Sequence, residues 1–154
     1  MLQSFKDLFD AFTEPAEESA EARARALRLA TAVLLVEVMR ADPTMNAAER
    51  KAVMATLHKK FALTDDQAAQ LFDLAELTAR DASDYYQFTS RINDSFTHPQ
   101  KIGIIENMWQ IAYADAHLDA NENHLISKIA GLLYVTQGEY IGARMRAKEA
   151  AGIE

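Results

Sequence analysis

The chain has 154 residues, a length that fits one domain with a hydrophobic core. Apolar residues make up 49% of it and charged residues 25%, so the composition is that of a globular protein and not of a disordered one. The formal net charge of −7 argues against nucleic-acid binding, which needs a basic face for the phosphates. Cysteine is absent, which excludes disulfides and thiol redox chemistry in this chain.

The N-terminal segment, residues 1–13, predicts a short amphipathic helix. Its apolar residues recur on one helical face, at Leu2, Phe5, Leu8, Phe9 and Phe12. Lys6 and Asp7 interrupt the segment, which therefore lacks the apolar run of a secretory signal. We expect a cytoplasmic protein whose first helix docks on the protein's own core. A partner protein is the next choice for that face, and membrane binding is not expected.

Residues 14–154 predict a single domain made only of helices. Between Leu27 and Met39 the chain is apolar on nearly all sides of a helix, which places that helix at the centre of a bundle. No segment alternates with period two over a length that suggests a sheet. The expected bundle has seven or eight helices, at residues 2–12, 15–41, 46–61, 65–80, 83–95, 98–115, 119–134 and 137–150.

Capping boxes mark many of these helix starts. In this pattern a Ser, Thr, Asn or Asp side chain accepts from the backbone three residues on, where Glu or Gln reaches back. The pattern, with its Asx variant, opens at Asn46, Thr64, Thr97, Asp119 and Thr136.

Two stretches of the chain, residues 34–49 and 107–122, share one pattern. In each, an apolar helix ends in Ala-Asp, and a turn leads through an apolar residue to a helix start that carries Glu. The matching positions are Asp42 with Asp115, Asn46 with Asp119, and Glu49 with Glu122. The repeat predicts two pseudo-symmetric helix–turn–helix units, each with an apolar face that it cannot bury alone.

The second copy, from Ala114 to Glu122, reads Ala-Asp-Ala-His-Leu-Asp-Ala-Asn-Glu. It resembles the A-D-G-x-[ILV]-[DST]-x-x-E signature of the TerB-like tellurite-resistance family, and the resemblance covers roughly residues 25–150. It implies an all-α TerB-like helical bundle, a link to tellurite resistance and stress responses, and acidic turns as candidate sites for a divalent metal. The chain departs from the pattern at Ala116, where the family has Gly, and in the first copy at Pro43 and Asn46.

Five acidic residues of the two turns are candidate ligands for a divalent cation: Asp42, Glu49, Asp115, Asp119 and Glu122. Carboxylate oxygens suit Ca²⁺ or Mg²⁺, although the spacing is not that of an EF-hand loop. Helix capping explains Glu49, Asp119 and Glu122 without a ligand. It does not explain Asp42 and Asp115, because a carboxylate at the end of a helix faces the negative pole of the helix dipole. Either a bond from the Asp side chain to the turn amides two residues on or a ligand would explain them. Capping and metal binding both remain open.

The sequence contains no phosphate loop, no nucleophile elbow and no zinc-protease pair, so we expect a protein that is not an enzyme. His117 and His124 flank the second turn, but not at a standard zinc spacing. We expect a non-enzymatic stress-response module that acts through protein partners, with a homo-oligomer as one form. No cofactor is expected beyond the candidate divalent metal ion. A structural scaffold or adaptor without a ligand is the alternative.

Overall fold

The computed structural model describes residues 19–42, 47–114, 118 and 120–153, and every regular element within them is a helix. The helices are α2 (Ala20–Ala41), α3 (Ala47–Lys60), α4 (Asp65–Asp81), α5 (Tyr86–Ser95), α6 (His98–Ala112), α7 (Ala120–Leu132) and α8 (Gln137–Ala150). The expected all-α class and the order of these helices are confirmed. The predicted helix at residues 2–12, and with it the segment 1–13, lies outside the described residues.

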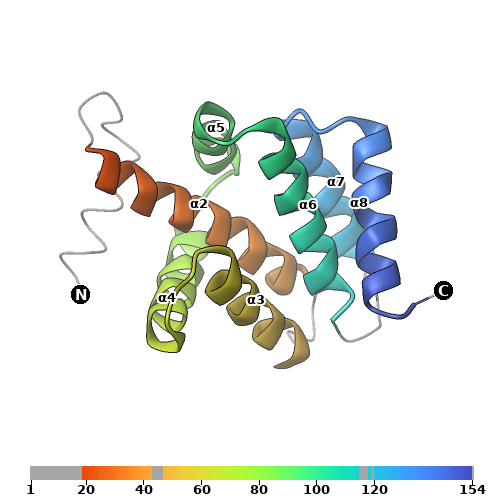
Figure 1. Ribbon diagram of the computed structural model, residues 1–154, viewed down its shortest axis with the longest axis horizontal. Helices are drawn as coiled ribbons and strands as arrows, with labels where there is room; N and C mark the ends of the chain where they lie inside the picture. Colours follow the sequence, from red (N-terminus) through yellow and green to blue (C-terminus); the bar gives the residue numbers. More distant parts are fainter. Residues whose placement is uncertain (1–18, 43–46, 115–117, 119, 154) are drawn as a thin grey trace.

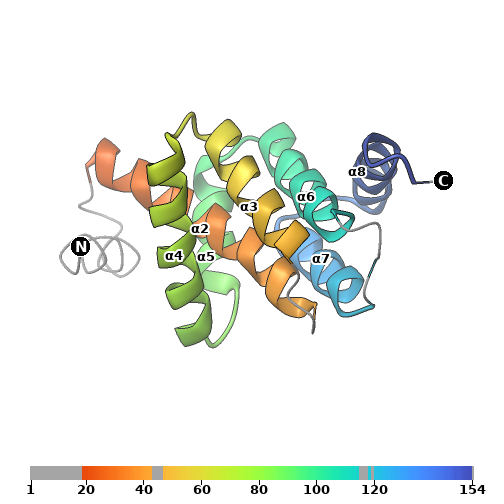
Figure 2. The same cartoon turned by 90° about the horizontal axis from the view of Figure 1, so that it is seen from below.

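Helix α2 crosses the middle of the molecule, and α3, α4, α5, α6 and α7 pack around it (Figures 1 and 2). From Leu29 to Val36 every residue of α2 is buried. A helix that is apolar nearly all round can leave water only in such a surrounded position. The predicted central place of this helix is therefore confirmed. None of the described helices combines the length and the apolar character needed to span a bilayer.

Two helix starts differ from the sequence-based prediction. Helix α2 begins at Ala20 and not near residue 15, because Ser19 takes an extended conformation and its side chain accepts from the Ala22 N–H at 3.1 Å. Helix α5 begins at Tyr86 and not at residue 83, because the Asp84 carboxylate accepts from the Tyr86 N–H at 2.9 Å in the turn that precedes the helix. In both places a polar side chain satisfies the first helical amides and fixes the start.

Three capping boxes are confirmed. The side chains of Thr64, Thr97 and Thr136 accept from the third amide of α4, α6 and α8, and Gln or Glu at that third position reaches back. In α8 this residue is Glu139, which also lies 2.8 Å from His98 Nε2 and so joins the start of α8 to the start of α6. The predicted boxes at Asn46 and Asp119 fall outside the described residues.

An aromatic cluster holds α8 against α6. Trp109 is fully buried, and its ring lies 5.8 Å from that of Tyr113 and 5.5 Å from that of Tyr140. The Arg144 guanidinium lies 4.9 Å from the Trp109 ring, and its Nε donates to the Tyr113 hydroxyl at 2.8 Å. The guanidinium therefore satisfies a polar atom and an aromatic face at once. Helix α8 lies at the edge of the fold, against α6 (Figure 1).

Leu34→Ala tests the central role of α2. Leu34 is fully buried, so its truncation should lower the free energy of unfolding by about 2–5 kcal/mol, measured by urea denaturation. Leu77→Ala is the matched control, because Leu77 on α4 is 52% exposed and its loss should cost within about 0.5 kcal/mol. Equal losses for the two variants would contradict the burial of Leu34 in the core.

Candidate metal centre

Three carboxylate side chains converge where α2 ends and where α3 and α7 begin. They belong to Asp42, Glu49 and Glu122, and one oxygen of each lies within 4.8 Å of the others. Asp42 is 3% exposed, and the two glutamates are fully buried. Asp42 and Glu49 come from the first helix–turn–helix unit, the hairpin of α2 and α3. Glu122 comes from the second, the hairpin of α6 and α7. This carboxylate cluster therefore joins the two halves of the fold.

The ends of the helices place these side chains. Asp42 caps the end of α2 with an extended backbone, at φ −80° and ψ 117°, and its N–H donates to the Met39 carbonyl at 3.2 Å. Glu49 lies in the first turn of α3, on the face that also carries the buried Val53 and Leu57. The chain thus leaves the most buried helix at an acidic residue and re-enters the core at another.

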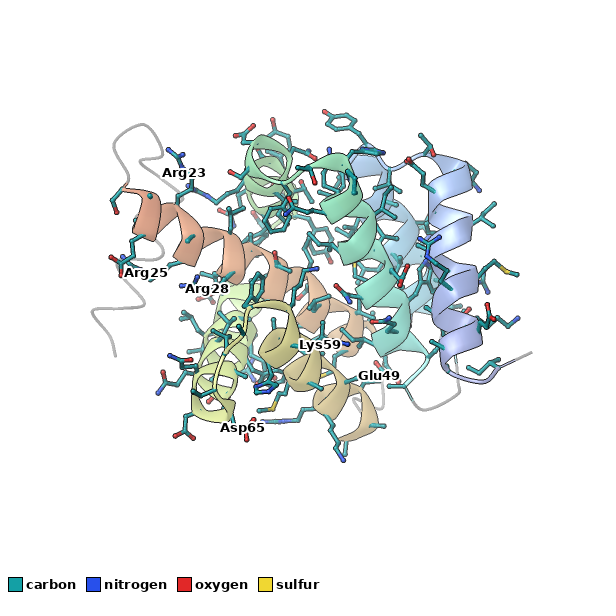
Figure 3. The ribbon with its side chains drawn as sticks, in the orientation of Figure 1. Arg23, Arg25, Arg28, Glu49, Lys59 and Asp65 are labelled. Carbon is teal, nitrogen blue, oxygen red and sulfur yellow. The ribbon has the colours of Figure 1, made fainter. Side chains whose placement is uncertain are left out.

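Glu122 has the corresponding place in α7, where it shares a face with the buried Ile126 and Ile129. Figure 3 labels Glu49 at the start of α3 and, by contrast, Asp65 at the start of α4, whose side chain points out into solvent. The Asp65 side chain is fully exposed. Position in the first turn of a helix therefore does not decide burial, whereas the helix face does.

The carboxylate cluster cannot hold three negative charges in the core without compensation, because desolvation and mutual repulsion both oppose ionisation. Burial is the largest cause that raises the pKa of Glu49 far above its usual 4.5. Hydrogen bonds to the side chains of Glu122 and Asp42, and the charges of those groups, raise it further. At neutral pH and without a cation, burial and the neighbouring carboxylates therefore favour the protonated form of Glu49.

A polar network holds the last turns of α2 against its neighbours. The Tyr85 hydroxyl donates to Glu37 at 3.0 Å, and Arg40 pairs with the same carboxylate. Lys128 of α7 lies over the Tyr85 ring, at 5.4 Å. Burial, and then the Glu37 charge, raise the pKa of Tyr85 to about 12, so this hydroxyl remains a donor at neutral pH. The network fixes α2 relative to α5 and α7 close to where α2 reaches Asp42.

The structure brings together three of the five predicted ligands. Asp115 and Asp119 lie outside the described residues, so the full set stays a prediction. Helix capping leaves the full burial of Glu49 and Glu122 unexplained, because a capping side chain can stay exposed to solvent. The sequence does contain a pattern that predicts the burial of Glu49. Glu49 precedes Val53 and Leu57 at helical spacing, so it lies on the apolar face of α3.

Of the two histidines near the second turn, the structure describes only His124, which does not join the carboxylate cluster. His124 is exposed and lines a shallow pocket with Tyr85 and Lys128, and His117 lies outside the described residues. Among the described residues, the one group of metal-ligating side chains close enough to share an ion is the carboxylate cluster.

Comparison with known proteins identifies the family. The family model described as tellurite resistance protein TerB matches residues 28–145, about three quarters of the chain. The chain belongs to the TerB family. The resemblance predicted from the second turn is thus confirmed, and the matched range contains both copies of the repeat, residues 34–49 and 107–122, with all three buried carboxylates. No curated protein and no solved structure gave a match.

Glu49→Gln tests the protonation of the carboxylate cluster in the absence of a cation. In the unfolded chain Glu49 ionises near pH 4.5, whereas in the folded chain it stays protonated to much higher pH. Its contribution to stability is therefore fully present below about pH 4.5 and is lost as the pH rises toward the folded-state pKa. Relative to Glu49→Gln, the unfolding free energy of the wild type should fall by up to about 1.4 kcal/mol per pH unit.

Urea denaturation with a chelator present, at several pH values from weakly acidic to weakly basic, measures this difference. Asp73→Asn on the exposed side of α4 is the control and should follow the wild type. If Glu49→Gln showed the same pH dependence as the wild type, Glu49 would not be the protonated group.

Proposed function

We propose that this TerB-family protein is a non-enzymatic cytoplasmic stress-response module that binds a divalent cation at the carboxylate cluster and acts through protein partners. The observation that supports the proposal is the convergence of Asp42, Glu49 and Glu122, from both hairpins, at one buried point. The family match supports a role of the tellurite-resistance type.

The chemistry of the carboxylate cluster favours a hard cation. Its described donors are carboxylate oxygens, which suit Ca²⁺, Mg²⁺ and Mn²⁺, and include neither a thiolate nor an imidazole to favour Zn²⁺. A divalent ion there would replace the proton on Glu49 and offset the repulsion among the three groups. Asp115 and Asp119 remain the predicted sources of further oxygen ligands.

A cation in this place would link α2 and α3 to α7. Because its ligands come from both hairpins, the ion would bind the assembled fold better than any opened form and would stabilise it. The surface that a partner recognises would then be firmer in the cation-bound protein. This is how a buried ion could control a protein–protein contact without touching the partner.

A structural scaffold without a ligand is the second candidate. The closeness of Glu49 to Glu122 and Asp42 favours it, because a protonated Glu49 can donate to a neighbouring carboxylate without a metal. The two proposals differ in whether a cation displaces that proton. Titration with cations separates them.

Calorimetric titration of chelator-treated protein with Ca²⁺, Mg²⁺, Mn²⁺ and Zn²⁺ tests the cation proposal. We expect at least one oxygen-preferring ion to bind with a dissociation constant below about 1 mM. Asp42→Asn and Glu122→Gln should each weaken that binding by at least about tenfold, because each removes one charged ligand. Asp73→Asn, an exposed carboxylate on α4, is the matched control and should leave binding unchanged.

The same titration at several pH values should show tighter binding as the pH rises, because Glu49 must release its proton to become a ligand. Comparison of buffers with different ionisation enthalpies counts the protons released. Asp115→Asn shows whether the second turn contributes a ligand. The scaffold proposal is the correct one if no cation binds more tightly than about 1 mM.

A further inference from the structure

The outward face of α8 carries large apolar side chains in contact with solvent. Ile141 is 48% exposed and Met145 60% exposed, and Gly138 and Gly142 lie on the same face at helical spacing. The opposite face of α8 buries Ala143 and Ala147 against the rest of the protein. Helix α8 is at the edge of the fold, so this outward face is open to another molecule (Figures 1 and 2).

Packing within the chain does not require the two glycines. Among the described residues, a Cβ added at Gly138 would meet no atom within 4 Å, and one added at Gly142 would come near the guanidinium of Arg146 alone, at 3.3 Å. Glycine in a helix costs about 0.5–1 kcal/mol relative to alanine. What glycine provides in return is a shallow surface that a second helix can approach closely.

The charged residues beside this face of α8 are complementary to those of a second copy of α8 packed against it. Glu139 and Arg146 lie on the same flank of α8, and each pairs within the chain with a residue of α6, Glu139 with His98 and Arg146 with Glu106. When two identical helices pack antiparallel across a twofold axis, like flanks face each other. An axis beside Gly142 would therefore set Glu139 opposite the partner's Arg146, and the symmetry would repeat the pair.

We propose that α8 is the interface of a homodimer, in which the α8 helices of two copies pack antiparallel across a twofold axis near Gly142. The two Gly142 residues lie at the closest approach, and Met145 packs beside the partner's Ile141. One pair of helices buries less than the roughly 1,200 Å² of a standard stable interface. The dimer therefore dissociates on dilution. The proposal does not depend on a cation at the carboxylate cluster.

Sedimentation equilibrium of the full chain over a range of concentrations tests the dimer. We expect a reversible monomer–dimer equilibrium, and Met145→Asp should raise its dissociation constant by at least about tenfold. Leu77→Asp is the matched control, because Leu77 is exposed to a similar degree on α4, away from α8, and it should leave the equilibrium unchanged. Circular dichroism confirms that both variants keep the helical fold.

Cross-linking tests the direction of packing, since the natural chain has no cysteine. Gly142→Cys should form a disulfide-linked dimer under mild oxidation, because the residue lies at the axis. Gly138→Cys should not, because an antiparallel arrangement carries its two copies to opposite sides of the axis. A wild type that stays monomeric at the highest soluble concentration would overturn the proposal. So would an equal effect of Leu77→Asp, or efficient cross-linking through Gly138→Cys.

Discussion

The burial of α2 on all sides between Leu29 and Val36 is the constraint on which the rest of the structure depends. A helix with an apolar surface nearly all round stays in water only at a high cost, so the other helices must enclose it. The end of such a helix also lies in the interior, where its polar groups find little water. The chain leaves α2 at Asp42 and re-enters the core at Glu49, and the first turn of α7 brings Glu122 to the same place. The carboxylate cluster is thus a consequence of where the central helix ends.

Two kinds of local signal predicted most of the fold. The apolar run in α2 predicted the central helix, and Thr–x–x–Gln/Glu boxes predicted the starts of α4, α6 and α8. The start of α2 was missed because Pro15 and Ser19 both suit a helix start, and local pattern does not rank them. The site was predicted only as two separate acidic turns. Their meeting depends on contact between hairpins far apart in the chain, which periodicity cannot supply.

The repeat gains a physical meaning from the carboxylate cluster. Glu49 and Glu122 occupy matching positions of the two hairpins, and in the structure they meet. Asp115, which matches Asp42 in the repeat, lies outside the described residues. Buried carboxylates stabilise a fold less than apolar side chains of similar size would. Three of them at the junction of the repeats therefore favour a role beyond packing.

The aromatic cluster between α6 and α8 gives the protein an optical label of its own. Trp109 is the single tryptophan of the chain, so all of the indole emission comes from one buried point. Its surroundings are a cation from α8 and the Tyr113 ring at the end of α6. A shift of α8, or of the end of α6 that leads toward α7, would alter the polarity around that indole. Movements of α8 or of the end of α6 can therefore be followed by fluorescence in the natural sequence, without a dye.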